Sequence, residues 1–223
     1  MRHHNATIDP PRPLLRGYSH AVAAVAAVGG LPLLLRAADG DLATQAALLV
    51  YGLSAVLLFA CSALYHTLPW TPHYRAVLRR LDHAMIFVMI AGAYTPIAYT
   101  TLMGWWRAGL LAAVWALALA GVAAVTLPRP VPRRVRVGLY VALAWLTVSV
   151  SPTILVPLGP RGLLLPLAGG VLFMAGALAY SLRRPVLWPR VFGYHELFHL
   201  TVIGGNGAFF LFMVQYVAPL ARH

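Results

Sequence analysis

Residues 43–66 read ATQAALLVYGLSAVLLFACSALYH, a run of 24 residues without Asp, Glu, Lys or Arg. The hydrocarbon core of a bilayer is about 30 Å thick, and a helix needs roughly 20 apolar residues to cross it. A helix also satisfies its own backbone hydrogen bonds, which a membrane interior without water requires. The run therefore predicts a membrane-spanning helix that ends at His66.

Six more stretches of similar length and composition precede and follow this one. The seven predicted spans cover approximately residues 18–35, 43–66, 82–102, 105–127, 136–157, 162–182 and 195–219. We expect an all-α membrane protein, a seven-transmembrane helix bundle, with a short tail over residues 1–17 and one transmembrane domain over residues 18–219. Because the spans take up most of the chain, any functional site has to lie between helices.

The composition excludes several other classes of protein. Hydrophobic residues make up 61% of the chain, charged residues 10%, and the mean hydropathy is +0.76, which does not describe a water-soluble surface. A single cysteine, Cys61, excludes an internal disulfide. The net charge of +12 would suit nucleic-acid binding, but the 17 basic residues are all arginine and are scattered between apolar stretches. The pattern instead indicates a membrane protein with a basic cytoplasmic face, so we expect a multi-pass protein of the plasma or inner membrane, with membrane lipids and not nucleic acid as partners. Arginine in place of every lysine, with heavy use of alanine, is compatible with a bacterial genome rich in G and C.

The arginines also predict an orientation. Thirteen of the 17 lie in the N-terminal tail or in the second, fourth and sixth connections, and four lie on the other side. Cytoplasmic loops are enriched in Lys and Arg, so we expect a cytoplasmic N-terminus and, with an odd number of spans, an extracytoplasmic C-terminus. The alternative, a cleaved signal peptide at the N-terminus, is disfavoured because the apolar run continues through Leu31 to Leu35.

Small residues and prolines within the spans are expected to serve packing. The prolines are expected to kink their helices, which membrane bundles tolerate; they are Pro96, Pro152 and Pro166. The glycines are expected to be close contacts between helices and not ligand contacts; they are Gly92, Gly169, Gly170, Gly176, Gly204, Gly205 and Gly207.

Two of the five acidic residues stand out by their position. Asp82 opens the third predicted span and Glu196 lies one residue into the seventh, close to hydrocarbon, where an unpaired carboxylate is costly. Two arginines just before Asp82 offer a simple neutralising partner, so a functional role for this carboxylate competes with a structural one. The other three acids lie in the tail and the first external loop, where water solvates them: Asp9, Asp39 and Asp41.

The nine histidines fall into two groups. Five are expected in tails, in a loop or at a span end facing water: His3, His4, His20, His73 and His223. The other four lie at cytoplasmic span ends: His66, His83, His195 and His199. Three helices therefore bring imidazoles and the Asp82 carboxylate to one membrane depth, and metal binding is the simplest explanation.

The spacing of the last two internal histidines supports a metal site. His195 and His199 are four residues apart, so their imidazoles share one helical face with about 5–6 Å between Cβ atoms, and two such imidazoles can bind one Zn²⁺. The stretch also matches HExxH, a metalloprotease signature with the glutamate as base. However, no acidic residue follows His199, and the terminal histidine is the only one after it. The third ligand has to come from upstream, and His66 is best placed.

The residues near these histidines differ in their expected roles. Ser62 is four residues before His66, so its hydroxyl lies along the same face, although a hydroxyl bonded to its own helix would explain it too. Cys61 is about 140° away from His66, which argues against a thiolate ligand. Glu196 is roughly 100° from His195 and is expected to support the site or lie at the interface. We expect His83 to make packing or polar contacts.

Four separated motifs occur in order, three of them at the ends of predicted spans and the third one further along the third span: Ser62-xxx-His66, Arg80-Leu81-Asp82-His83, Tyr94-Thr95-Pro96 and His195-xxx-His199. Together they resemble the hemolysin III branch of the progestin and adipoQ receptor (PAQR) family, over nearly the whole chain. The resemblance implies a zinc ion near the cytoplasmic side, bound by His66, His195 and His199. It also implies that Asp82 holds the zinc-bound water and that Ser62 lies beside it.

The resemblance leaves more than one function open. Relatives include the adiponectin receptors, associated with ceramidase activity, and the alkaline ceramidases, which implies a zinc-dependent lipid amide or ester hydrolase with Asp82 and Ser62 as catalytic residues. Bacterial members are named hemolysin III after a reported cell-lysing, pore-forming activity. The alternative is therefore a non-enzymatic sensor of lipid state or a lytic pore with a structural zinc. An intramembrane protease that uses Glu196 as its base is a third hypothesis.

Overall fold

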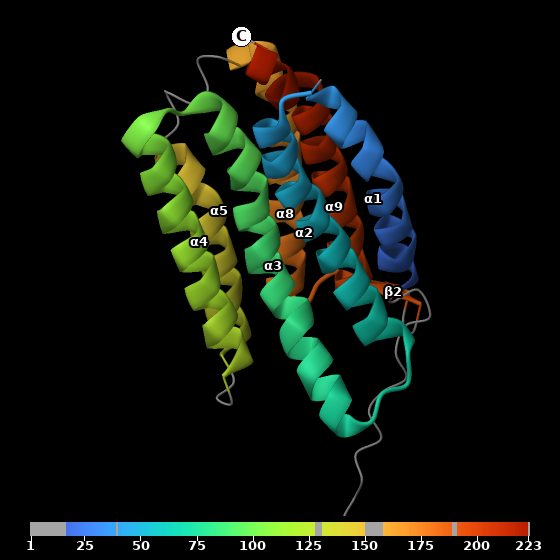
Figure 1. The fold of residues 1–223 in the computed structure, drawn as a ribbon. Helices are drawn as coiled ribbons and strands as arrows, with labels where there is room; N and C mark the ends of the chain where they lie inside the picture. Colours follow the sequence, from blue (N-terminus) through green and yellow to red (C-terminus); the bar gives the residue numbers. More distant parts are fainter. Residues whose placement is uncertain (1–16, 39, 128–130, 150–157, 189–190, 223) are drawn as a thin grey trace, which may run out of the picture.

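The computed structural model describes residues 17–38, 40–127, 131–149, 158–188 and 191–222 (Figure 1). The long helices are α1 (Tyr18–Ala37), α2 (Leu42–Thr67), α3 (Pro72–Thr101), α4 (Gly104–Thr126), α5 (Arg133–Ser149), α8 (Leu164–Leu182) and α9 (Tyr194–Phe212). A short helix, α7 (Gly159–Gly162), precedes α8. The chain continues from α9 through a π-helical segment, Met213–Val217, and a 3₁₀ segment, Ala218–Arg222.

Six helical segments in the described residues are long and apolar enough to cross a membrane. They are α1, α2, α3, α4, the segment of α7 with α8, and the segment from Tyr194 to Leu220. α5 lies at the position of the predicted fifth span with 17 residues, and residues 150–157 of that prediction lie outside the described residues. The expectation of an all-α membrane protein is confirmed. Of the predicted N-terminal tail, only Gly17 lies within the described residues.

α3 begins ten residues before the predicted third span, at Pro72. Proline is favoured in a first turn because its missing N–H would have no partner there, and the arginines that follow are good helix formers. The apolar run marks the part of the helix that crosses hydrocarbon, and the helix itself begins earlier. Asp82 therefore lies about three turns into α3, and it is not the first residue of this helix as the predicted span suggested.

A short antiparallel ribbon joins α8 to α9, and the sequence did not predict it. Its strands are β1 (Val186–Trp188) and β2 (Phe192–Gly193), with Val186 opposite Gly193. Such short strands are too brief for an alternating pattern of apolar and polar residues to be recognised. The ribbon leads directly into Tyr194, the first residue of α9, and so positions the start of that helix.

Buried hydroxyls tie the helices together. α2 lies between α1 and α3, and α8 packs along α9 (Figure 1). The Tyr51 hydroxyl on α2 donates to the Asn206 carbonyl of α9 at 3.3 Å. The Tyr94 hydroxyl on α3 donates to the Leu143 carbonyl of α5 at 3.0 Å, and α3 continues past Pro96 to Thr101. The Tyr94-Thr95-Pro96 motif thus helps to hold α5 against α3.

Glycines let α8 and α9 approach each other closely. A Cβ on Gly205 would lie 2.5 Å from the Phe173 ring, and one on Gly169 would lie 2.7 Å from the Phe209 ring. The predicted packing role therefore holds at these positions. It was wrong for Gly170 and Gly207, where a Cβ would meet nothing within 4 Å in the described structure.

Replacing Gly205 with alanine is expected to destabilise the protein by about 1–3 kcal/mol, because the new methyl group forces the Phe173 ring aside in a packed interface. The matched control is Gly207→Ala on the same helix, where the methyl group has space and the better helix propensity of alanine, worth up to about 1 kcal/mol, is gained. Thermal unfolding of the detergent-purified variants measures both. Equal melting temperatures for the two variants would contradict this account of the α8–α9 contact.

Candidate metal centre

Three predicted ligands meet at one end of the bundle. His66 is in the last turn of α2, and His195 and His199 are in the first two turns of α9, which begins at that same end (Figure 1). The nitrogens that each residue can offer lie within 4.8 Å of one another. His66 and His199 are buried. The structure therefore brings together, from two helices distant in sequence, the three histidines that can hold one metal ion.

One separation within this cluster matches that of two ligands of a single metal ion. Nε2 of His66 lies 3.3 Å from Nε2 of His195. Two nitrogens bound at about 2.0–2.1 Å to one tetrahedral Zn²⁺ would be about 3.3–3.4 Å apart. Imidazole donors suit zinc, copper, iron and nickel. Three protein donors leave one tetrahedral position open, as in catalytic zinc sites and unlike structural sites with four.

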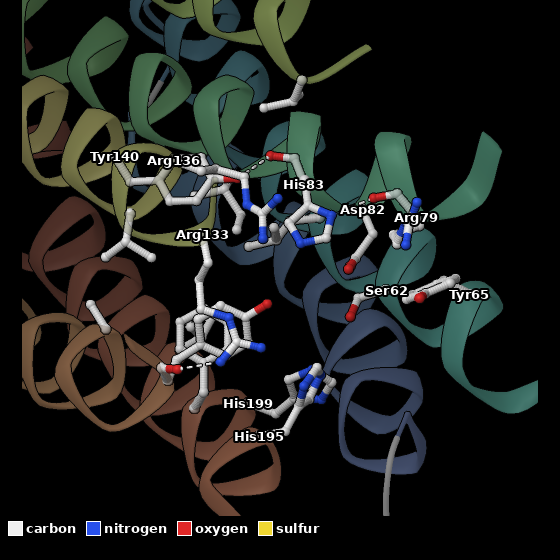
Figure 2. A pocket seen from close by; sticks show the side chains of 18 of the residues that line it. Ser62, Tyr65, Arg79, Asp82, His83, Arg133, Arg136, Tyr140, His195 and His199 are labelled. Atoms are coloured by element: carbon white, nitrogen blue, oxygen red, sulfur yellow. Dashed lines mark hydrogen bonds between the residues drawn. The ribbon is translucent and has the colours of Figure 1, made fainter. Parts of the chain in front are cut away.

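Asp82 and Ser62 lie beside the histidine cluster. Oδ2 of Asp82 is 3.9 Å from Nε2 of His66, and Ser62, on the neighbouring helix α2, is buried. Figure 2 shows these two side chains facing each other, with His195 and His199 on the α9 side. The carboxylate thus lies next to the cluster, with a hydroxyl of the neighbouring helix facing it.

The prediction that His20 faces water was wrong. Its side chain is 3% exposed, and its ring stacks on that of His199 with centroids 3.9 Å apart and 13° between the planes. Nε2 of His20 is 3.4 Å from the His199 carbonyl oxygen. His20 lies at the same end of the bundle as His66, His195 and His199. The inference that histidines at one membrane depth come together would therefore have included His20. The stacking restrains the orientation of the His199 ring from a third helix, α1.

A glycine allows α1 to begin so close to the cluster. Gly17 has φ 95°, in the region that side chains rarely adopt. A Cβ at this position would also lie 2.7 Å from Cβ of His66. Only glycine fits both constraints, so Gly17 lets the start of α1, and with it His20, pack against the last turn of α2.

Glu196 acts on the start of α9. Its carboxylate is buried, and Oε2 accepts the backbone N–H of Gly193 at 2.9 Å. A glutamate at the third position of a helix commonly reaches back in this way to an N–H that the helix leaves without a partner. Glu196 therefore stabilises the turn that carries His195. This contact agrees with the supporting role that the sequence predicted for Glu196.

Replacing Glu196 with glutamine is expected to leave the metal content of the protein unchanged, because the amide oxygen can still accept the Gly193 N–H. Glu196→Ala removes that acceptor, and we expect a loss of about 0.5–2 kcal/mol of stability. Metal analysis and thermal unfolding of the two variants check this. If the glutamate were instead the base of a protease, the glutamine variant would lose all activity while keeping its metal.

His83 and Cys61 stay outside the cluster of ligating atoms in the described residues. Nδ1 of His83 bonds to the Arg79 carbonyl of the preceding turn, and the His83 carbonyl accepts from the Tyr140 hydroxyl at 2.9 Å. The metal-binding group contains the three histidines and not the Cys61 thiol. His83 thus makes the polar contacts that the sequence predicted for it.

A cavity of ≈ 430 Å³ lies against this cluster, between residues of α1, α2, α3, α4, α5, α8 and α9. Ser62, Asp82, His195 and His199 line it. Its volume falls within the range of about 300–1,000 Å³ typical of small-molecule sites. The polar groups of the cluster can therefore reach a ligand that enters the bundle.

Fold and site together define a multi-pass α-helical membrane protein whose histidine cluster can hold a metal ion. The family model described as haemolysin-III related matches residues 9–210, and the chain belongs to this family. It is similar to Hemolysin-3 from Bacillus cereus, with 31% identity over 207 residues that cover 91% of this chain and 90% of that protein. It is also similar to a Hemolysin-3 homolog from Bacillus subtilis (strain 168), with 30% identity over 75% of each chain. The protein is thus a multi-pass cell-membrane protein of the haemolysin III type.

Proposed function

We propose that the protein is a zinc-dependent hydrolase that cleaves an amide or ester bond of a membrane lipid, as the resemblance to the PAQR family implies. The observation that carries the proposal is the Asp82 carboxylate, which faces Ser62 and lies 3.9 Å from one of three clustered histidines, beside a cavity. A purely structural metal site has no need of such a carboxylate. Three imidazoles with one open position are a donor set found in catalytic zinc sites.

A zinc ion in the cluster would lower the pKa of a bound water to about 7 and polarise a carbonyl oxygen. The side chains of the protein would hold the ion, transfer the proton and orient the group that transfers it. His66, His195 and His199 would hold the ion. Asp82 would accept a proton from the attacking water and return it to the departing nitrogen or oxygen, and the Ser62 hydroxyl would keep the carboxylate turned toward the cluster.

The overall reaction is a hydrolysis with no other reactant. Water forms a new bond to the carbonyl carbon, the C–N or C–O bond breaks, and the products are a fatty acid and an amine or alcohol. Apolar side chains such as Leu58, Ile86 and Val202 line the cavity beside the polar groups. A bond between an acyl chain and a polar head would therefore lie where both parts of the ligand find suitable surroundings.

A second function is supported by the names of the relatives, which describe haemolysins. Under this alternative the metal would stabilise the bundle, and the protein would lyse membranes or sense their lipid state without chemistry. The two functions share the histidine cluster and differ in the role of Asp82, which has no task in a metal site that only stabilises.

The test uses the full chain in phosphatidylcholine vesicles that contain a ceramide or an ester lipid. We expect fatty acid release that stops after treatment with a zinc chelator and returns when zinc is added back. Fatty acid release that persists without metal would overturn the proposal. Leakage of a trapped dye without any release of fatty acid would favour the lytic alternative.

A further inference from the structure

The cavity beside the histidine cluster is strongly cationic. Four arginine side chains line it, two from α3 and two from α5: Arg79, Arg80, Arg133 and Arg136. Among the described residues of its lining, Asp82 is the one carboxylate. A divalent metal in the cluster would add further positive charge. The described lining thus has more positive than negative charge, and an anionic ligand would compensate the excess.

Arg133 is held in place as a binding group. Its Nη1 donates to the Tyr180 carbonyl at 2.9 Å, and its guanidinium carbon lies 4.4 Å from the centre of the Tyr180 ring and 5.7 Å from that of Tyr194. The Tyr180 ring in turn lies 5.7 Å from the His195 ring, centroid to centroid. One aromatic ring therefore separates this guanidinium from the histidine cluster, and several of its five N–H donors remain for a ligand.

Arg136 points into the same region. Figure 2 shows its guanidinium next to His83, between Tyr140 and Arg133. Its Nε is buried and has no hydrogen-bond partner among the described residues. Buried N–H groups are nearly always paired in proteins, and a planar guanidinium matches the oxygens of a phosphate in a bidentate manner. An oxyanion between Arg133 and Arg136 would give this donor a partner.

The excess of arginine on the cytoplasmic face does not by itself explain this arrangement. Arg134 lies on the same helix and is exposed, and it is not part of the cavity lining. Arginines that serve only to orient the protein in the membrane have no need to face inward. The neighbours Arg133 and Arg136 face the cavity instead, together with apolar side chains such as Val137, Ala177 and Phe198.

We propose that this cavity binds a phosphate-bearing lipid, with the phosphate held by Arg133 and Arg136 and the acyl part against the apolar lining. This inference deepens the proposed function and rests on it only for the reaction: the hydrolase is then expected to cleave a phosphate-bearing lipid in preference to a neutral one such as ceramide. The binding site itself stands on the arginines and not on the metal.

The test measures how many molecules of phosphatidic acid the purified full-length protein retains across a titration, by native mass spectrometry from detergent. We expect one tightly bound molecule in the wild type, and binding weakened about tenfold or more in Arg136→Gln and in the Arg133→Gln, Arg136→Gln double variant, because charge-assisted hydrogen bonds are lost. Arg134→Gln removes the same charge from the exposed side of α5 and is expected to leave binding unchanged within about twofold. Circular dichroism and melting temperatures verify that each variant is folded, and Arg136→Gln keeps the Arg133 contact with Tyr180.

Three results would overturn the inference. Equal weakening by Arg134→Gln would mean that only the general surface charge attracts the lipid. Ceramide retained as tightly as phosphatidic acid would exclude recognition of the phosphate. Full displacement of the lipid by millimolar inorganic phosphate would identify a site for the free anion. Repeating the titration with His66→Ala separates the two proposals: retained lipid binding without hydrolysis supports the lipid site even where the zinc hydrolase is lost.

Discussion

Alanine in place of His66 or His199 is expected to leave the purified protein without stoichiometric zinc. Each change removes one of three imidazoles whose nitrogens lie within 4.8 Å of one another, and two remaining donors hold a metal ion far less tightly. The loss of affinity is expected to exceed the roughly 10–100-fold that removal of a mere supporting partner costs. Metal analysis of the dialysed protein measures it directly, with one zinc per chain expected in the wild type.

Thermal unfolding gives a second readout of the same loss. A ligand that binds only the folded state stabilises it by about 4 kcal/mol at a free concentration 1,000 times its Kd. The wild type is therefore expected to melt at a lower temperature after a chelator is added, whereas the melting of His66→Ala is expected not to respond. His73→Ala is the matched control, because His73 is exposed in the first turn of α3 at the same end of the bundle.

Stoichiometric zinc in His66→Ala would overturn the ligand assignment. It would revive the HExxH hypothesis, in which α9 supplies two ligands and Glu196 serves as base. The buried Glu196 carboxylate already accepts the Gly193 N–H, and this contact argues for a role in the start of the helix. The two variants His66→Ala and Glu196→Gln therefore give opposite results under the two hypotheses.

The sequence predicted the bundle and the members of the histidine cluster because both depend on local patterns. Apolar runs of about 20 residues indicate spans, and the four-residue spacing puts His195 and His199 on one face. His66 could be added because alternating spans bring its helix end to the same membrane depth. Each of these inferences needs only the period of a helix and the thickness of a bilayer.

The contacts that the sequence did not predict depend on how helices rotate and pack. His20 was predicted to face water, and its burial against His199 was missed because it depends on the rotation of α1 about its axis. The inward direction of Arg136, against the exposed direction of Arg134, likewise depends on the packing of α5. The order of residue types along the chain did not predict how α1 and α5 are rotated about their axes. The early start of α3 was missed because an apolar run indicates which residues cross the hydrocarbon core and does not indicate where the helix begins.

Replacing Asp82 with asparagine is expected to abolish most lipid hydrolysis while zinc stays bound. The amide keeps the size of the carboxylate and an oxygen that can accept from Ser62, but it has no negative charge and cannot take up a proton. Loss of a general base typically costs about 10²–10⁴-fold in rate. The three histidines are untouched, so the zinc content is expected to stay close to one per chain. Fatty acid release and metal analysis on the same preparation measure both.

Asp41→Asn is the matched control for this change. Asp41 caps the start of α2, where its carboxylate accepts the N–H groups of Ala43 at 3.2 Å and Thr44 at 3.3 Å, and asparagine caps helices about as well. This variant is therefore expected to keep both zinc and hydrolysis. Unchanged hydrolysis in Asp82→Asn would remove the argument for catalysis, because the carboxylate beside the histidines is what distinguishes this cluster from a structural metal site. Zinc lost together with hydrolysis would instead assign Asp82 to holding the metal, and the base would then have to be sought among the other groups that line the cavity.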